Sequence, residues 1–197
     1  GLRFAFLIGL PCSVGMSVLS EQIFRFFYHG SLSEENIMTG STLLMVSSLT
    51  VVLFTVVQAT SSILQGVRKQ RIPMYTLVAG VVCKIALNYT LVGIPGFNIH
   101  GAPISSLVCY TVSLVPNLYY VMKYTGTKFN WRDWLVRPGI ATLAMGAAVC
   151  LMTRILPFSR LLTIVEVAVG IAVFVVTAIW TKALTKEDLN AFRRKRK

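Results

Sequence analysis

The segment PMYTLVAGVVCKIALNYTLVGI, residues 73–94, decides the fold class of this chain. It holds 22 residues with one charged side chain, Lys84, and as a helix rising about 1.5 Å per residue it would cross a membrane core of roughly 30 Å. Five further segments share this character: residues 4–28, 41–64, 102–122, 135–156 and 161–183. A buried soluble helix is also apolar all round, but six in series with short loops predict an all-α, polytopic membrane bundle of six transmembrane helices.

The composition supports this class and excludes others. Of 197 residues 55% are hydrophobic and 13% charged, whereas soluble proteins carry about 25% charged residues. A disordered chain would be polar, and four cysteines are too few for a disulfide scaffold. We therefore expect a membrane protein.

The positive charges lie on alternate loops. Fifteen of the 19 Lys and Arg residues fall on one side of the predicted membrane: Arg3, Arg68, Lys69, Arg71, Lys123, Lys128, Arg132, Arg137, Lys182, Lys186 and residues 193–197. The opposite ends hold Arg25, Arg154 and Arg160. Cytoplasmic loops are enriched in Lys and Arg, so both termini are predicted to be cytoplasmic. This asymmetry accounts for the net charge of +12 without a nucleic-acid partner, and the basic tail would bind anionic lipid headgroups.

Polar side chains recur at helical spacing in three consecutive segments. The stripes are Ser48, Thr55, Gln58, Ser62 and Gln65; Thr76, Gly80, Lys84 and Asn88; and Ser106, Tyr110, Ser113, Asn117 and Tyr120. Such stripes indicate either hydrogen-bonded contacts between helices or the wall of a hydrated cavity. The Ser and Thr positions favour the first interpretation, and the added Gln and Asn residues favour the second.

Lys84 is the most informative of these residues because it lies midway along its segment. An ammonium at the centre of a bilayer costs about 2.5 to 3.5 kcal/mol on insertion scales, so it should face protein or water. One interpretation is structural, with hydrogen bonds to carbonyls or to Asn88. The other is a cation that attracts an anionic substrate. The candidate substrate-binding residues are Lys84, Asn88, Gln58 and Asn117.

Acidic residues are rare in the segments. Glu21 and Arg25 are four apart, which predicts an intrahelical ion pair; the alternative interpretation is a gate at the outer mouth. Glu166 lies near the outer end of the last segment, where it most simply reaches the interface; an ion-coupling role is the alternative.

Prolines and small residues also mark the segments. Pro11, Gly15 and Pro116 are expected to interrupt their helices, either as packing kinks or as bends used in transport. Small residues in 135–156 and 161–183 predict that these two helices pack together as a hairpin.

No catalytic or metal-binding pattern accompanies these features. The cysteines are widely spaced, the two histidines are isolated, and neither a phosphate-binding loop nor a nucleophile motif occurs. We therefore expect no enzyme activity, no catalytic residue, no metal and no cofactor.

A family resemblance emerges around the third segment. Its elements are Gln65 and Gly66, Ile72 and Pro73, the run from Lys84 to Tyr89 (KIALNY), Leu91, Ile94 and Pro95, Gly101 and Ala102, and the later LTKED at 184–188. In order and spacing these resemble the C-terminal part of polysaccharide and lipid-linked oligosaccharide flippases of the multidrug/oligosaccharidyl-lipid/polysaccharide superfamily. The stage V sporulation protein B group, related to lipid II flippases, is most similar. Pro103 departs from the small residue expected there.

The resemblance implies a domain organisation. That family has about fourteen helices in two lobes, related to each other as repeats. Residues 1–124 would then be four helices of the second lobe, 125–183 a C-terminal helix pair, and 184–197 a basic cytoplasmic tail. The chain begins at Gly1 with an apolar segment almost at once, so we expect part of a longer protein whose N-terminal lobe is a partner. The helix pair is associated in lipid II flippases with a groove for the lipid tail.

The functional hypothesis is a flippase of the bacterial plasma membrane. It would move a lipid-linked oligosaccharide or peptidoglycan precursor, on a polyprenyl pyrophosphate, by alternating access. A drug/cation antiporter of the same superfamily is one alternative, and cation dependence would identify it. A non-transporting membrane scaffold is another, and it would show no substrate-dependent transport.

Overall fold

The structure, a computed structural model, describes residues 2–28, 32–93, 98–126, 132–155 and 159–181. Within these ranges the chain is helical and has no strand, which confirms the all-α membrane fold. The helices are α1 (Leu2–Val18), α2 (Ser20–Tyr28), α3 (Glu34–Gly66), α4 (Arg71–Val92), α5 (Gly101–Thr125), α6 (Arg137–Ile155) and α7 (Arg160–Trp180). A short 3₁₀ turn (Asn98–His100) precedes α5, and a π-helical turn (Arg132–Val136) precedes α6.

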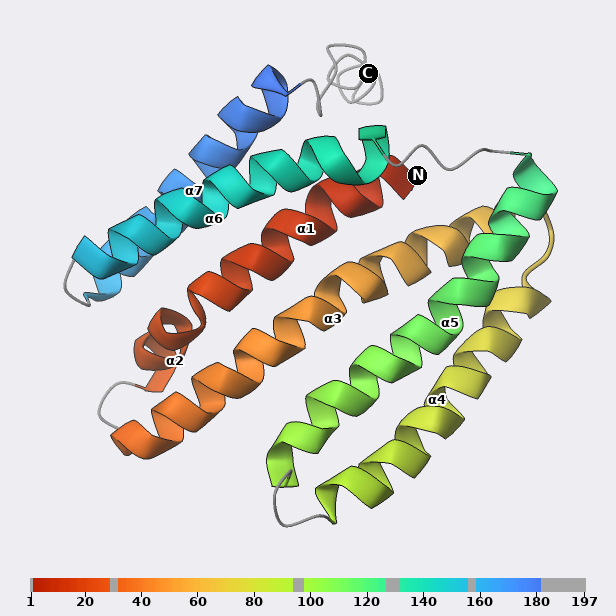
Figure 1. Cartoon of the computed structure of the whole chain (residues 1–197), viewed down its shortest axis with the longest axis horizontal. Helices are drawn as coiled ribbons and strands as arrows, with labels where there is room; N and C mark the ends of the chain where they lie inside the picture. Colours follow the sequence, from red (N-terminus) through yellow and green to blue (C-terminus); the bar gives the residue numbers. More distant parts are fainter. Residues whose placement is uncertain (1, 29–31, 94–97, 127–131, 156–158, 182–197) are drawn as a thin grey trace.

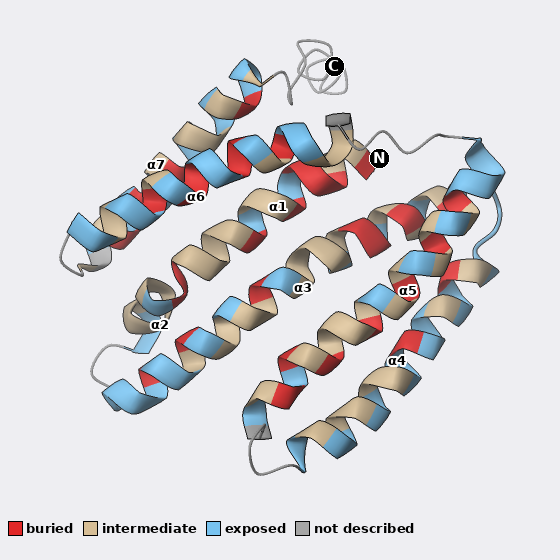
Figure 2. Ribbon diagram, in the orientation of Figure 1, coloured by how far each residue is buried: buried red, intermediate tan, exposed pale blue. Residues whose placement is uncertain are grey.

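The helices stand side by side in the order α7, α6, α1, α3, α5, α4 (Figure 1). One apolar cluster joins α1, α3 and α5 through residues such as Phe6, Val56 and Val121. Two more clusters join α1 to α6 and α7, around Ala141 and Met145. The result is an open row rather than a closed bundle, and α4 at its margin packs almost entirely on α5. Figure 2 shows how few residues of α4 are buried.

The first predicted segment is not one straight helix. It breaks at Leu19, where α1 and α2 meet at 65°. Five described helices are long and apolar enough to span a membrane, and there are six crossings when this bent pair counts as one. Pro11 and Pro116 lie inside helices that continue on both sides of them, so neither proline ends its helix. The break lies instead where the apolar run gives way to Ser20, Glu21 and Gln22.

The second segment is longer than predicted. Helix α3 begins at Glu34 rather than residue 41, and its 33 residues rise about 50 Å. Residues 34–40 lie between the predicted segments 4–28 and 41–64 and were therefore not expected to be helical. The sequence there offers no Pro, and Glu34 and Glu35 in the first turn interact favourably with the positive end of the helix dipole.

The small residues of the last two helices have divided roles. A Cβ added to Gly170 of α7 would lie 3.0 Å from Val149 of α6, as expected for a packed hairpin. A Cβ added to Gly146 of α6 would lie 2.8 Å from Val14 Cγ1, so Gly146 instead lets α6 approach α1. The pair α6–α7 is therefore also attached to the rest of the row.

Candidate functional site

The polar stripe of α4 lies against α5 and forms what we call the α4–α5 seam: Thr76, Gly80 and Asn88 with Ser105, Ser113 and Asn117. At one end of the seam, Thr76 Oγ1 donates a 2.8 Å hydrogen bond to Asn117 Oδ1. Asn117 is completely buried, and its Nδ2 donates a long 3.5 Å bond to Ser61 Oγ of α3. Asn117 thus links three helices.

Gly80 sets the distance between α4 and α5. A Cβ at this position would lie 2.5 Å from Ser113 Oγ and 2.6 Å from the Cys109 carbonyl oxygen. The single hydroxyl proton of Ser113 is shared between the Thr76 carbonyl across the seam, 3.1 Å from Ser113 Oγ, and the Cys109 carbonyl of its own helix, at 3.0 Å. A small residue therefore allows close approach and interhelical hydrogen bonding at the same point.

Asn88 closes the other end of the seam. Ser105 Oγ donates a 2.6 Å hydrogen bond to Asn88 Oδ1, and Ser105 is completely buried. Ser105 was not among the predicted site residues. Its position in the helix before the polar stripe of residues 106–120 gave no signal of this contact.

Lys84 lies on the same face of α4, one turn before Asn88, and is half-buried. Within the described residues its ammonium makes no ion pair. Lys84 is thus a positive charge inside an apolar segment that no described carboxylate neutralises.

Gln58 is not part of the seam. It lies on α3 and is exposed, while the next turn of α3 contributes Ser61 to the contact with Asn117. The structure therefore brings Asn88 and Asn117 into one seam, with Lys84 beside it, and leaves Gln58 on a neighbouring helix. Their role in binding substrate stays a prediction.

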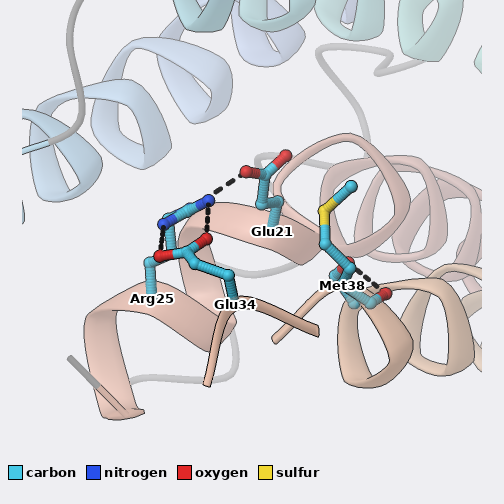
Figure 3. A network of polar contacts seen from close by, with 5 residues as sticks. Glu21, Arg25, Glu34 and Met38 are labelled. Atoms are coloured by element: carbon cyan, nitrogen blue, oxygen red, sulfur yellow. Dashed lines mark hydrogen bonds and ion pairs between the residues drawn. The ribbon is translucent and has the colours of Figure 1, made fainter. Parts of the chain in front are cut away.

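A second polar group lies where α2 meets the start of α3: Arg25 of α2 forms ion pairs with Glu21 of its own helix and with Glu34 of α3 (Figure 3). Arg25 Nε donates to Glu21 Oε1 at 2.9 Å, and its two terminal nitrogens donate to the Glu34 carboxylate at 3.0 and 2.7 Å. Glu34 lies before the predicted segment 41–64, so its part in this ion pair was not predicted. A gating role for Glu21 and Arg25 stays a prediction.

Two cavities lie between the bent first crossing and the α6–α7 pair. The first, about 160 Å³, is lined by polar residues of α2, α6 and α7 and includes Glu166. Glu166 is only 4% exposed, so the expectation that it reaches the interface is wrong. The second cavity, about 390 Å³, has an almost entirely apolar lining of α1, α2, α6 and α7 residues.

The family model described as "Lipid II flippase MurJ" matches residues 1–176. The chain belongs to the lipid II flippase MurJ family. The resemblance inferred from residues 65–102 is thereby confirmed.

Individual relatives agree with this family. The chain is 30% identical over 184 residues to the lipid II flippase MurJ of Bacillus subtilis (strain 168), covering 86% of this chain and 32% of that protein. It is 24% identical over 207 residues to the uncharacterized membrane protein YabM of the same organism, covering 96% of this chain and 36% of the relative.

A solved structure shows the fold. The lipid II flippase MurJ in an inward closed conformation superposes with a TM-score of 0.72 at 19% identity, covering 94% of this chain and 38% of that one. The chain thus spans about a third of the length of its MurJ relatives. Its helices form a multi-pass membrane unit of this transporter fold.

Proposed function

We propose that this chain is the C-terminal part of a flippase that moves a lipid-linked oligosaccharide or peptidoglycan precursor across the bacterial plasma membrane. The observation that carries the proposal is the match of residues 1–176 to the lipid II flippase MurJ family. The mechanism is alternating access, with no covalent chemistry. Neither the geometry nor the comparisons favour a drug/cation antiporter or a membrane scaffold.

The open row supports the division into domains. Residues 1–124 form four crossings of one lobe, 125–183 a C-terminal pair, and 184–197 a tail outside the described residues. Helices α1, α3 and α5 share an apolar cluster, and α6 packs on α7. The poorly covered α4 leaves room for the N-terminal lobe as a partner.

The cytoplasmic placement of both termini belongs to the same proposal. The start of α1, the end of α3, the start of α4 and the end of α5 meet at one end of the row (Figure 1). Arg3, Arg68, Lys69, Arg71 and Lys123 lie on these ends, and Lys69 lies 5.2 Å from the centre of the Tyr124 ring. A positive end of this kind faces the cytoplasm.

Lys84 is the residue proposed to attract the pyrophosphate of the substrate. The support is its unneutralised charge in the middle of a crossing, where cationic groups commonly mark substrate paths. Asn88 lies one turn away. Ser105 Oγ donates a hydrogen bond to Asn88 Oδ1, and this bond also fixes the direction of the Asn88 amide nitrogen. Gln58 offers an exposed amide on α3, while Asn117 reaches a headgroup only when the seam opens.

The polyprenyl tail is proposed to occupy the 390 Å³ apolar cavity between the first crossing and the α6–α7 pair. Its walls include Cys12, Met16, Met145 and Phe174. An isoprenoid chain requires an apolar surface of this kind and no hydrogen-bonding partner.

The test uses the full-length protein reconstituted in vesicles with a lipid-linked pyrophosphoryl glycan. We expect Lys84→Gln to lower the flipping rate at least tenfold, Lys84→Arg to retain most of it, and Lys123→Gln, at the exposed end of α5, to leave it unchanged. Unchanged flipping in Lys84→Gln removes Lys84 from the mechanism. Absence of any flipping by the unmodified protein overturns the proposed function itself.

A further inference from the structure

Two buried oxygen atoms near the bend of the first crossing have no hydrogen-bond partner among the described residues. They are Oε2 of Glu166 on α7 and Oε1 of Gln22 on α2. Both side chains line the 160 Å³ cavity between α2, α6 and α7. Glu166 is almost completely buried, with 4% of its surface exposed. Buried polar atoms are nearly always hydrogen-bonded, so two orphan acceptors in one cavity require an explanation.

The surroundings of the cavity supply further acceptors. Thr153 Oγ1 donates to the Cys150 carbonyl at 3.0 Å, and Thr163 Oγ1 donates to the Ser159 carbonyl at 3.2 Å. Because each hydroxyl proton is used in this way, the hydroxyl oxygens keep only lone pairs for the cavity. An ionised carboxylate in this setting is costly unless a positive charge accompanies it.

No described neighbour supplies that charge. Arg25 also lines the cavity, but its guanidinium is bound by Glu21 and Glu34. The other titratable groups among the described lining residues of the two cavities are Glu21 on α2 and Cys12 on α1. From α6 the described lining offers the Thr153 hydroxyl and apolar side chains.

We propose that Glu166 and Gln22 bind one small monovalent cation, a proton or a sodium ion, between α2 and α7. A single carboxylate with neutral oxygen donors suits a hard ion of one charge, and within the described ranges no three His, Cys, Asp or Glu side chains gather for a transition metal. The loaded site ties the bent half of the first crossing to α7. Glu166 also borders the apolar cavity, so occupancy of the site bears on the shape of that cavity.

The proposal is tested by binding rather than transport, so its outcome is independent of the flippase activity. The full-length protein in lipid nanodiscs is compared with E166Q, Q22L and, as a matched control, E35Q, which alters an exposed glutamate of α3. Thermal unfolding is measured in sodium chloride and in choline chloride at equal ionic strength. Infrared difference spectra record carboxyl protonation as the pH is changed.

Two results support the site and distinguish its ion. Stabilisation by sodium that is present in the unmodified protein and E35Q, and lost in E166Q and Q22L, identifies sodium. A titrating carboxyl band without sodium dependence, lost in E166Q and displaced in pH in Q22L, identifies the proton. If the unmodified protein shows neither a sodium effect nor a carboxyl band that E166Q removes, the proposal is wrong. If E166Q does not fold, the comparison of the unmodified protein with Q22L still tests the site, because Q22L keeps the Glu166 carboxylate and loses only the Gln22 amide.

Discussion

Ser105 Oγ donates a 2.6 Å hydrogen bond to Asn88 Oδ1, one helical turn beyond Lys84. This bond fixes the end of α4 against α5 and holds the polar face on which Lys84 lies. We expect Ser105→Ala to lower the stability of the full-length protein by about 0.5 to 2 kcal/mol, since interhelical hydrogen bonds in membranes are worth about this much. Ser106→Ala, which removes a hydroxyl bonded only within its own helix at Ala102, is the control. Equal unfolding midpoints for the two variants would contradict the importance of the bond.

Gly80 permits the close contact of α4 with α5. In Gly80→Val the added carbons meet Ser113 Oγ and the Cys109 carbonyl, so overpacking should cost about 1 to 3 kcal/mol. Gly66→Ala, where no atom lies within 4 Å of the added Cβ, should be neutral or slightly stabilising. Thermal unfolding in detergent measures both changes, and a Gly80→Val midpoint at or above that of the unmodified protein would refute the contact.

Thr76 and Asn117 should be energetically coupled across the seam. A double-mutant cycle of Thr76→Val and Asn117→Ala is expected to give a coupling energy of about 0.5 to 1.5 kcal/mol, because each change removes one side of the 2.8 Å bond. Additive effects in chemical denaturation would show that the two side chains act separately.

The contact between Arg25 and Glu34 should be weak and sensitive to salt. Glu34 has 72% of its side chain exposed, and exposed ion pairs contribute about 0 to 1 kcal/mol. We expect Arg25→Gln to increase amide hydrogen exchange in α2 at low salt, and the difference to shrink as salt screens the pair. Glu34→Gln, which removes the charge of the partner and leaves the Arg25–Glu21 pair in place, should give a similar salt-sensitive increase; no increase in this variant would assign the effect of Arg25→Gln to Glu21 or to packing.

The orientation of the helices in the membrane can be measured with two single-cysteine variants, each made in a protein from which the four cysteines of this chain have been removed. With the basic ends in the cytoplasm, Glu35→Cys should react with a membrane-impermeant maleimide in intact cells. Lys69→Cys should react only after the membrane is opened. The opposite pattern would invert the proposed orientation.

Hydrophobic length and polar periodicity were enough to predict the crossings and the stripe of α4. Residues 73–94 and 102–122 correspond closely to α4 and α5, because segments of this length have few ways to cross a membrane. For Thr76, Asn88 and Asn117 the structure shows the interhelical hydrogen bonds that the stripes offered as one of two interpretations.

Other features depended on contacts distant in sequence. The bend at Leu19 and the start of α3 at Glu34 bring Arg25 and Glu34 together. The change to polar residues after Leu19 marks the place of the bend but not its angle, and residues 34–40 are too polar to be recognised as part of an apolar segment. The burial of Glu166 likewise depends on α2, which is distant from α7 in the sequence and meets it only in the folded chain. Residue patterns along one helix carry no information about which neighbour covers it.

The single-file order of the helices has a mechanical consequence. Among the described residues, a helix in the middle of the row, such as α3, is held from two sides, whereas α4 packs substantially on α5 alone. A movement of α4 in the membrane plane therefore breaks mainly its contacts with α5 and carries Lys84 with it, while the other described helices keep their packing.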